Sequence, residues 1–71
     1  MTNTELLKRS IDDSGISITF LAGKLGISRE GFYKKMNGET EYKASEIFKI
    51  QKILHLTDKM RDKIFFNEMV N

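Results

Sequence analysis

The chain contains no proline, and its apolar residues recur at spacings of three and four along most of its length. Such spacings place apolar side chains on one side of a helix, whereas a half-buried strand requires alternation at every second residue. Without proline, every residue can also donate its backbone N–H to a helical hydrogen bond. The pattern therefore predicts an all-α fold, a compact bundle of about five short helices.

Residues that cap and break helices divide the chain. Ser17, Ser28 and Thr57 each precede an apolar pattern, and the side-chain oxygens of Ser and Thr commonly cap helix N-termini. Gly15, Gly26 and the pair Asn37-Gly38 stand where such patterns stop. The expected helices cover residues 4–14, 18–25, 28–37, 44 to 55 or 56, and the segment that follows residue 57.

Length and composition limit what the chain can be. A chain of 71 residues has room for one domain, residues 1–71, and buries only about 60% of the surface that it exposes when unfolded. It has no cysteine, and a lone His55 cannot build a histidine metal site, so stability must come from packing and no cofactor is expected. Charge interrupts every hydrophobic stretch, which predicts a cytoplasmic protein without membrane contact.

Charge gives a weak indication of the partner. The net charge is +2, with six Lys and Arg against four Asp and Glu in residues 1–38, and six against six in the remainder. A mild basic excess of this kind is common in proteins that bind no nucleic acid, so charge alone decides nothing. The pattern of residues must carry the functional hypothesis.

The segment 28–37 stands out because so little of it is apolar. Phe32 and Met36, four residues apart, are its only clearly apolar side chains, so most of the helix circumference should face outward. The preceding helix has apolar residues at i, i+3, i+4 and i+7, and Gly26 and Ile27 separate the two. Two short helices joined by a glycine-containing turn form a helix-turn-helix unit, whose second helix can enter the major groove of DNA.

The run from Ile16 to Phe32, Ile-Ser-Ile-Thr-Phe-Leu-Ala-Gly-Lys-Leu-Gly-Ile-Ser-Arg-Glu-Gly-Phe, is followed by Asn37-Gly38. This signature resembles the helix-turn-helix family of phage lambda repressor and Cro proteins, which typically has a Leu-Ala-x-x-Leu-Gly-Ile-Ser segment and an Asn-Gly after the recognition helix. The resemblance covers most of the chain. It implies a bacterial or phage-encoded transcription regulator that occupies an operator on double-stranded DNA.

The resemblance also implies roles for particular residues. The base-reading positions of the family fall on Arg29, Glu30 and Lys34, with Ser28 and Tyr33 at the edge of the contact. Phosphate contacts are implied for Ser17, Asn37, Lys43 and Lys35. Taken outside this pattern, the same charges would be read as a solvated helix face, and Tyr33 as a ring packed on a neighbouring side chain.

Three positions depart from the pattern of the family. An apolar residue is usual where Lys35 stands, and Met36 takes that role one position later, so the end of the recognition helix is expected to be rotated or overwound. Ile18 replaces a polar residue that in relatives often touches phosphate. Gly31 lies inside the helix at a cost of about 1 kcal/mol relative to alanine.

The C-terminal end carries more apolar surface than one buried stripe needs. The run Ile64-Phe65-Phe66 places three consecutive bulky residues on a helix, and these cannot all face one way. At least one of them should therefore be exposed or paired. The family commonly binds DNA as a dimer, and the candidate interface of a homodimer comprises Ile64, Phe65, Phe66, Met69 and Val70. The alternative is a protein-interaction module of the same fold that binds another regulator through this helix.

Enzymatic function is not expected. The single histidine has no evident nucleophile beside it, no glycine-rich phosphate loop occurs, and the carboxylates Asp12 and Asp13 fall at a helix end where they should be solvated. No pattern in the chain indicates a small-molecule ligand. The sequence thus leaves a DNA-binding regulator and a protein-binding module as the two functional hypotheses.

Overall fold

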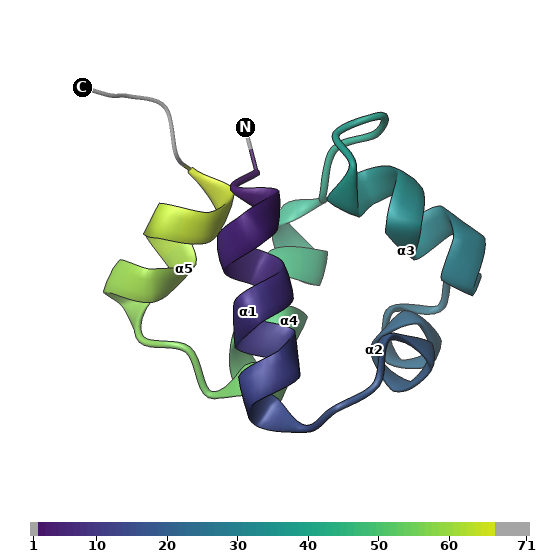
Figure 1. Ribbon diagram of the computed structural model, residues 1–71. Coiled ribbons are helices and arrows are strands. Elements are labelled where there is room, and N and C mark those ends of the chain that lie inside the picture. The colour runs from purple at the N-terminus through teal and green to yellow at the C-terminus, as the bar shows by residue number, and fades with distance from the viewer. Residues whose placement is uncertain (1, 67–71) are drawn as a thin grey trace.

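In the computed structural model, which describes residues 2–66, the chain is a bundle of helices with no strand in that range (Figure 1). The helices are α1 (Thr4–Ser14), α2 (Ile18–Leu25), α3 (Arg29–Met36), α4 (Ala44–Leu54) and α5 (Asp58–Phe65). The expected all-α bundle of five short helices is therefore confirmed. α1 to α4 lie within two residues of their predicted bounds, and α5 begins directly after the predicted cap Thr57.

Side-chain caps explain where the helices begin. The Oγ atoms of Ser17 and Ser28 accept hydrogen bonds from the backbone N–H groups three residues onward, at 3.0 and 2.9 Å. Asn3 and Thr57 do the same for α1 and α5, at 3.1 and 3.0 Å. Each of these bonds satisfies a backbone donor that the first turn of a helix leaves without a partner. Local sequence therefore determines four of the five helix starts.

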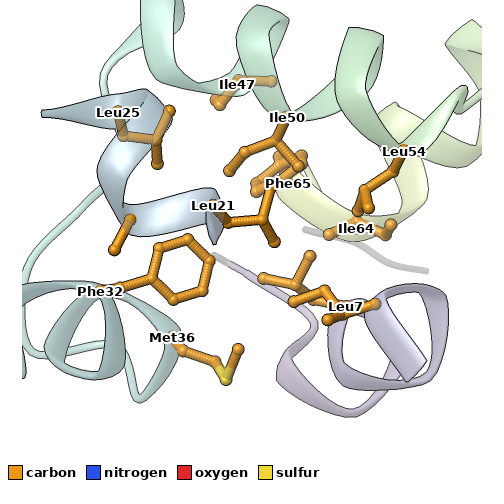
Figure 2. Close-up of a cluster of buried hydrophobic side chains, with 12 residues drawn as sticks. Leu7, Leu21, Leu25, Phe32, Met36, Ile47, Ile50, Leu54, Ile64 and Phe65 are labelled. Carbon is orange, nitrogen blue, oxygen red and sulfur yellow. The ribbon is translucent and has the colours of Figure 1, made fainter. Parts of the chain in front are cut away.

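One core joins all five helices. It consists of Leu7, Ile11, Leu21, Ala22, Leu25, Phe32, Met36, Ile47, Ile50, Leu54, Ile64 and Phe65. Figure 2 shows Phe32 and Met36 projecting from α3 toward Leu21 and Leu7. α2 packs on α3 and α4, while α5 packs on α1 and α4. Because Phe32 is fully buried and Met36 almost so, one side of α3 is fixed to the domain and the opposite side is left outward.

The end of α4 has an unusual backbone. His55 adopts the left-handed conformation, with φ at +56°, and is the only residue other than glycine with positive φ among residues 2–66. Its N–H donates to the carbonyl of Lys52, and the next N–H donates to the carbonyl of Gln51. This paired pattern ends α4 as a Schellman motif, at a position where glycine is the usual residue.

Replacing His55 by glycine should stabilise the domain by about 0.5–1 kcal/mol, since a side chain in the left-handed region costs roughly that much or more. The measurement is urea denaturation followed by far-UV circular dichroism. Gly26 provides the control, because its φ is +72° and nothing lies within 4 Å of an added Cβ. The free energy of unfolding of Gly26→Ala should therefore fall by about 1 kcal/mol, through backbone conformation alone. A loss of stability in His55→Gly would contradict the explanation.

Candidate functional site

The turn between α2 and α3 sets the direction of α3. Only three residues connect the helices, Gly26, Ile27 and Ser28. Gly26 has φ at +72°, its N–H donates to the carbonyl of Gly23, and the N–H of Ile27 donates to that of Ala22. Ile27 is half-buried and packs against the core. The turn is thus closed by hydrogen bonds at one end and held by an apolar side chain at the other.

The outward side of α3 gathers the residues predicted to read bases. Ser28, Arg29, Glu30, Tyr33 and Lys34 are all exposed, and the guanidinium carbon of Arg29 lies 6.0 Å from the centroid of the Tyr33 ring. That contact is a cation–π geometry, which limits the freedom of a long side chain at the surface. The prediction of a wide polar face on this helix is confirmed, and contact with bases stays a prediction.

Three of the four phosphate candidates are accessible. Ser17 caps α2, Asn37 follows the last residue of α3, and Lys43 precedes α4, and all three are exposed. The hydroxyl of Ser17 accepts from the N–H of Phe20, so its own proton remains available to a further acceptor. Ser17 and Lys43 lie at helix N-termini, where backbone amides can add to an anion contact, whereas Asn37 lies at the C-terminal end of α3 and can offer only its side-chain amide.

Lys35, the fourth candidate, is a correction. Its side chain is only 13% exposed, and its ammonium lies 3.3 Å from Oε1 of Glu46. It also donates a 3.0 Å hydrogen bond to the carbonyl of Glu41. The charge is turned toward α4 and the preceding loop, so it is not presented to a phosphate. The polar partners explain how a lysine occupies a position where an apolar residue is usual.

The expected rotation of the end of α3 is also wrong. The N–H of Asn37 donates to the carbonyl of Tyr33 as in a regular α-helix, and Gly38 and Glu39 then bond back to Lys35 and Lys34. These last two bonds form a Schellman end. Met36 and Lys35 are both accommodated without distortion, because Met36 enters the core and Lys35 meets Glu46.

Glu46 and Tyr42 are the structural residues that sequence reasoning missed. Glu46 is buried, and its carboxylate accepts a 2.8 Å hydrogen bond from the N–H of Lys43, which caps the start of α4. Tyr42 stacks edge-on against Phe32 and Phe65, at 6.1 and 5.1 Å between centroids. A glutamate three residues into a helix is the signal that could have indicated a capping role.

The phenol of Tyr42 is unusual in two respects. Its hydroxyl is buried and finds no hydrogen-bond partner among residues 2–66. Burial raises the pKa of this phenol well above its ordinary value of about 10, and the nearby Glu46 carboxylate raises it further. Tyr42 therefore remains protonated in the folded domain under conditions that ionise a solvated tyrosine.

The free energy of unfolding of Tyr42→Phe should exceed that of the wild type by about 1 kcal/mol at neutral pH, because the substitution removes a buried polar group without a partner. Above about pH 10 the unfolded chain loses the Tyr42 proton and the folded domain keeps it, so wild-type stability should fall by about 1.4 kcal/mol per pH unit through this group. The gain of the variant over wild type should grow accordingly in urea denaturation at rising pH. Tyr33→Phe, at an exposed ring, should show neither effect. An identical pH dependence for Tyr42→Phe and wild type would contradict the assignment.

Gly31 and Ile18, the other two positions that depart from the resembled pattern, have structural reasons. A Cβ at Gly31 would lie 3.2 Å from Oγ of Ser28, the atom that accepts from the Gly31 N–H. A larger residue would therefore crowd the cap of α3, and glycine leaves it undisturbed. Ile18 is half-buried and packs against the core. It therefore contributes to packing at a position where the resembled family often has a phosphate contact.

The candidate dimer interface needs correction. Ile64 is fully buried and Phe65 nearly so, and both belong to the core of the single chain (Figure 2). Phe66 is 55% exposed and is the one bulky residue of this run that faces outward. Met69 and Val70 lie outside the described residues. The burial of Ile64 and Phe65 also removes much of the surface on which the protein-interaction alternative depended.

Comparison with protein-family models gave no match, and neither did comparisons with curated proteins and with solved structures. Within residues 2–66, every helix is too short or too polar to cross a membrane.

Proposed function

We propose that the chain is a sequence-specific DNA-binding transcription regulator of the lambda repressor and Cro type, which reads the major groove with α3. The observation that carries the proposal is the division of α3 into a buried apolar side and an exposed polar side, on a helix joined to α2 by three residues. A recognition helix needs this combination, because its anchoring residues and its reading residues must occupy opposite sides.

The exposed side chains have suitable chemistry for bases. The Arg29 guanidinium can donate two hydrogen bonds to O6 and N7 of a guanine, and the Glu30 carboxylate can accept from the amino group of a cytosine. Lys34 lies about one helical turn further along and can reach a base or a phosphate. Ser28 and Tyr33 complete this surface, with Ser17, Asn37 and Lys43 as phosphate contacts. The exposed Glu39 and Glu41 would repel phosphates, so contact through the loop between α3 and α4 depends on its backbone.

The proposed mode of action is occupancy of an operator by a homodimer inside a bacterial cell. Proteins of this kind place two recognition helices on half-sites about 34 Å apart. Phe66, exposed at the end of α5, is the described residue of the predicted interface that remains accessible for a dimer contact. In this proposal protein concentration controls occupancy, and no small-molecule effector takes part.

A salt series of binding to the DNA that flanks its own gene tests the proposal. Specific binding should weaken steeply with salt, by about 0.9 in log affinity per log unit of salt for each phosphate neutralised. A random duplex of equal length should bind at least about a thousandfold more weakly. Equal affinity for the two duplexes at low salt would end the regulator hypothesis.

A further inference from the structure

The contact between Arg29 and Tyr33 lies on the exposed side of α3. Arg29 is the first residue of the helix, and Tyr33 follows about one turn later on the same side. The guanidinium carbon of Arg29 lies 6.0 Å from the centroid of the Tyr33 ring, and Tyr33 is 39% exposed. The two side chains therefore meet at the surface of the helix, outside the core.

The backbone beneath this pair is held in place. The Oγ atom of Ser28 accepts from the N–H of Gly31 at 2.9 Å, which caps the turn that carries Arg29. Phe32, next to Tyr33 in the chain, is fully buried and fixes the helix to the core. The freedom left to the Arg29 guanidinium is therefore mainly that of its own side-chain rotamers. A ring one turn away restricts that freedom.

An aromatic ring can restrain a guanidinium without using its hydrogen-bond donors, because the attraction acts between the charge and the face of the ring. Within residues 2–66 the side chain of Arg29 forms no ion pair and no hydrogen bond. Arg61 is the contrast, because its guanidinium lies near the Phe48 ring and also within 3.3 Å of the carboxylates of two aspartates. Arg29 is thus restrained while its donors stay open to an outside acceptor.

We propose that Tyr33 is a positioning residue for Arg29, whose ring holds the guanidinium so that the chain prefers guanine at one position of each half-site. The inference rests on the proposed function, since it requires α3 to lie in the major groove. Guanine presents O6 and N7 as adjacent acceptors, which match the paired donors of a guanidinium. A side chain that is already restricted loses less entropy when it forms this pair. The gain applies to guanine, because no other base offers these two acceptors together.

A direct contact between the Tyr33 hydroxyl and DNA is the competing explanation for a role of this residue. Such a contact depends on the hydroxyl group, whereas the positioning role depends on the ring. Tyr33→Phe removes the hydroxyl and keeps the ring, and Tyr33→Ala removes both. The two substitutions therefore distinguish the two roles.

Selection of bound duplexes from a random-sequence library, with the full chain, tests the proposal. The wild-type chain should enrich guanine at one position of each half-site, and Tyr33→Phe should enrich it as strongly. Tyr33→Ala should lower the ratio of guanine to adenine at that position about threefold, the order expected when a cation–π contact at an exposed site is lost. Preferences at the other positions and the melting temperature should not change, since Tyr33 is outside the core.

Two further variants assign the effect to the pair. Arg29→Ala should abolish the guanine preference, and adding Tyr33→Ala to it should change the ratio no further, because the ring then has no guanidinium to hold. Phe20→Ala is the matched control. Phe20 is 48% exposed on α2, and the ammonium of Lys24 lies 5.3 Å from its ring centroid, so the substitution removes a similar pair outside α3. It should leave the guanine ratio unchanged.

The outcomes separate this inference from the proposed function. An enriched sequence without that guanine, an equal guanine ratio in Tyr33→Ala and wild type, or an equal loss in Tyr33→Phe and Tyr33→Ala would overturn the positioning role and leave the regulator hypothesis standing. A further fall in the double variant relative to Arg29→Ala would also overturn it, because Tyr33 would then act without Arg29. Failure of the wild-type chain to enrich any sequence would overturn both.

Discussion

Glu46→Ala is expected to lower the free energy of unfolding by about 3 kcal/mol. The side chain of Glu46 is 9% exposed and that of its partner, Lys35, is 13% exposed. Removing the carboxylate leaves a lysine charge nearly buried beside the ring of Tyr42, 5.9 Å from its centroid. It also removes the acceptor of the Lys43 N–H at the start of α4. Glu46→Ala therefore removes both the ion pair with Lys35 and the side-chain cap of α4.

Further variants separate these two losses. Glu46→Gln keeps an oxygen that can accept from the Lys43 N–H and removes only the charge, so it should cost less than alanine. A Lys35→Met, Glu46→Met double variant should be more stable than the sum of its single variants, because neither charge is then left alone. Urea denaturation followed by circular dichroism measures all of them. Glu39→Ala, at an exposed loop carboxylate, is the control and should change stability by less than about 0.5 kcal/mol. The same small change in Glu46→Ala would show that the ion pair contributes nothing.

The helix boundaries could be predicted because their causes are local. Ser17, Ser28 and Thr57 cap helices through bonds to residues only three positions away, and Gly26 ends α2 through bonds within one turn. Short-range chemistry of this kind is readable from the order of residues alone. The exposed side of α3 follows in the same way, since Phe32 and Met36 already mark the opposite side.

Contacts between distant parts of the chain could not be predicted in this way. The surroundings of Lys35 depend on Glu41 and Glu46, which approach it only because the loop after α3 folds back. For the run Ile64-Phe65-Phe66, counting apolar residues indicates that one must be exposed, and only the packing of α5 on α1 and α4 decides that it is Phe66. Tyr42 enters the core from a loop, where no periodicity marks a buried residue.

The combined variant Arg29→Ala, Lys34→Ala is expected to weaken specific DNA binding by about a hundredfold at fixed salt. A bidentate contact between an arginine and guanine contributes about 1–3 kcal/mol of discrimination, and a lysine contact adds a smaller amount. Neither side chain contributes to the core, because both are exposed on the outward side of α3. The variant should therefore melt at the temperature of the wild-type domain.

Lys8→Ala, Arg9→Ala is the matched control for this loss. It removes the same two positive charges from exposed positions on α1, so the net charge of both double variants falls from +2 to 0. A general electrostatic attraction would weaken equally in the two proteins. Direct reading of bases predicts instead that the α3 variant loses its preference for the operator over random DNA, and that the α1 variant keeps it. Electrophoretic mobility shift or fluorescence anisotropy with both duplexes makes the comparison. Equal loss in the two variants would mean that α3 does not read sequence, because charge alone would then account for the binding.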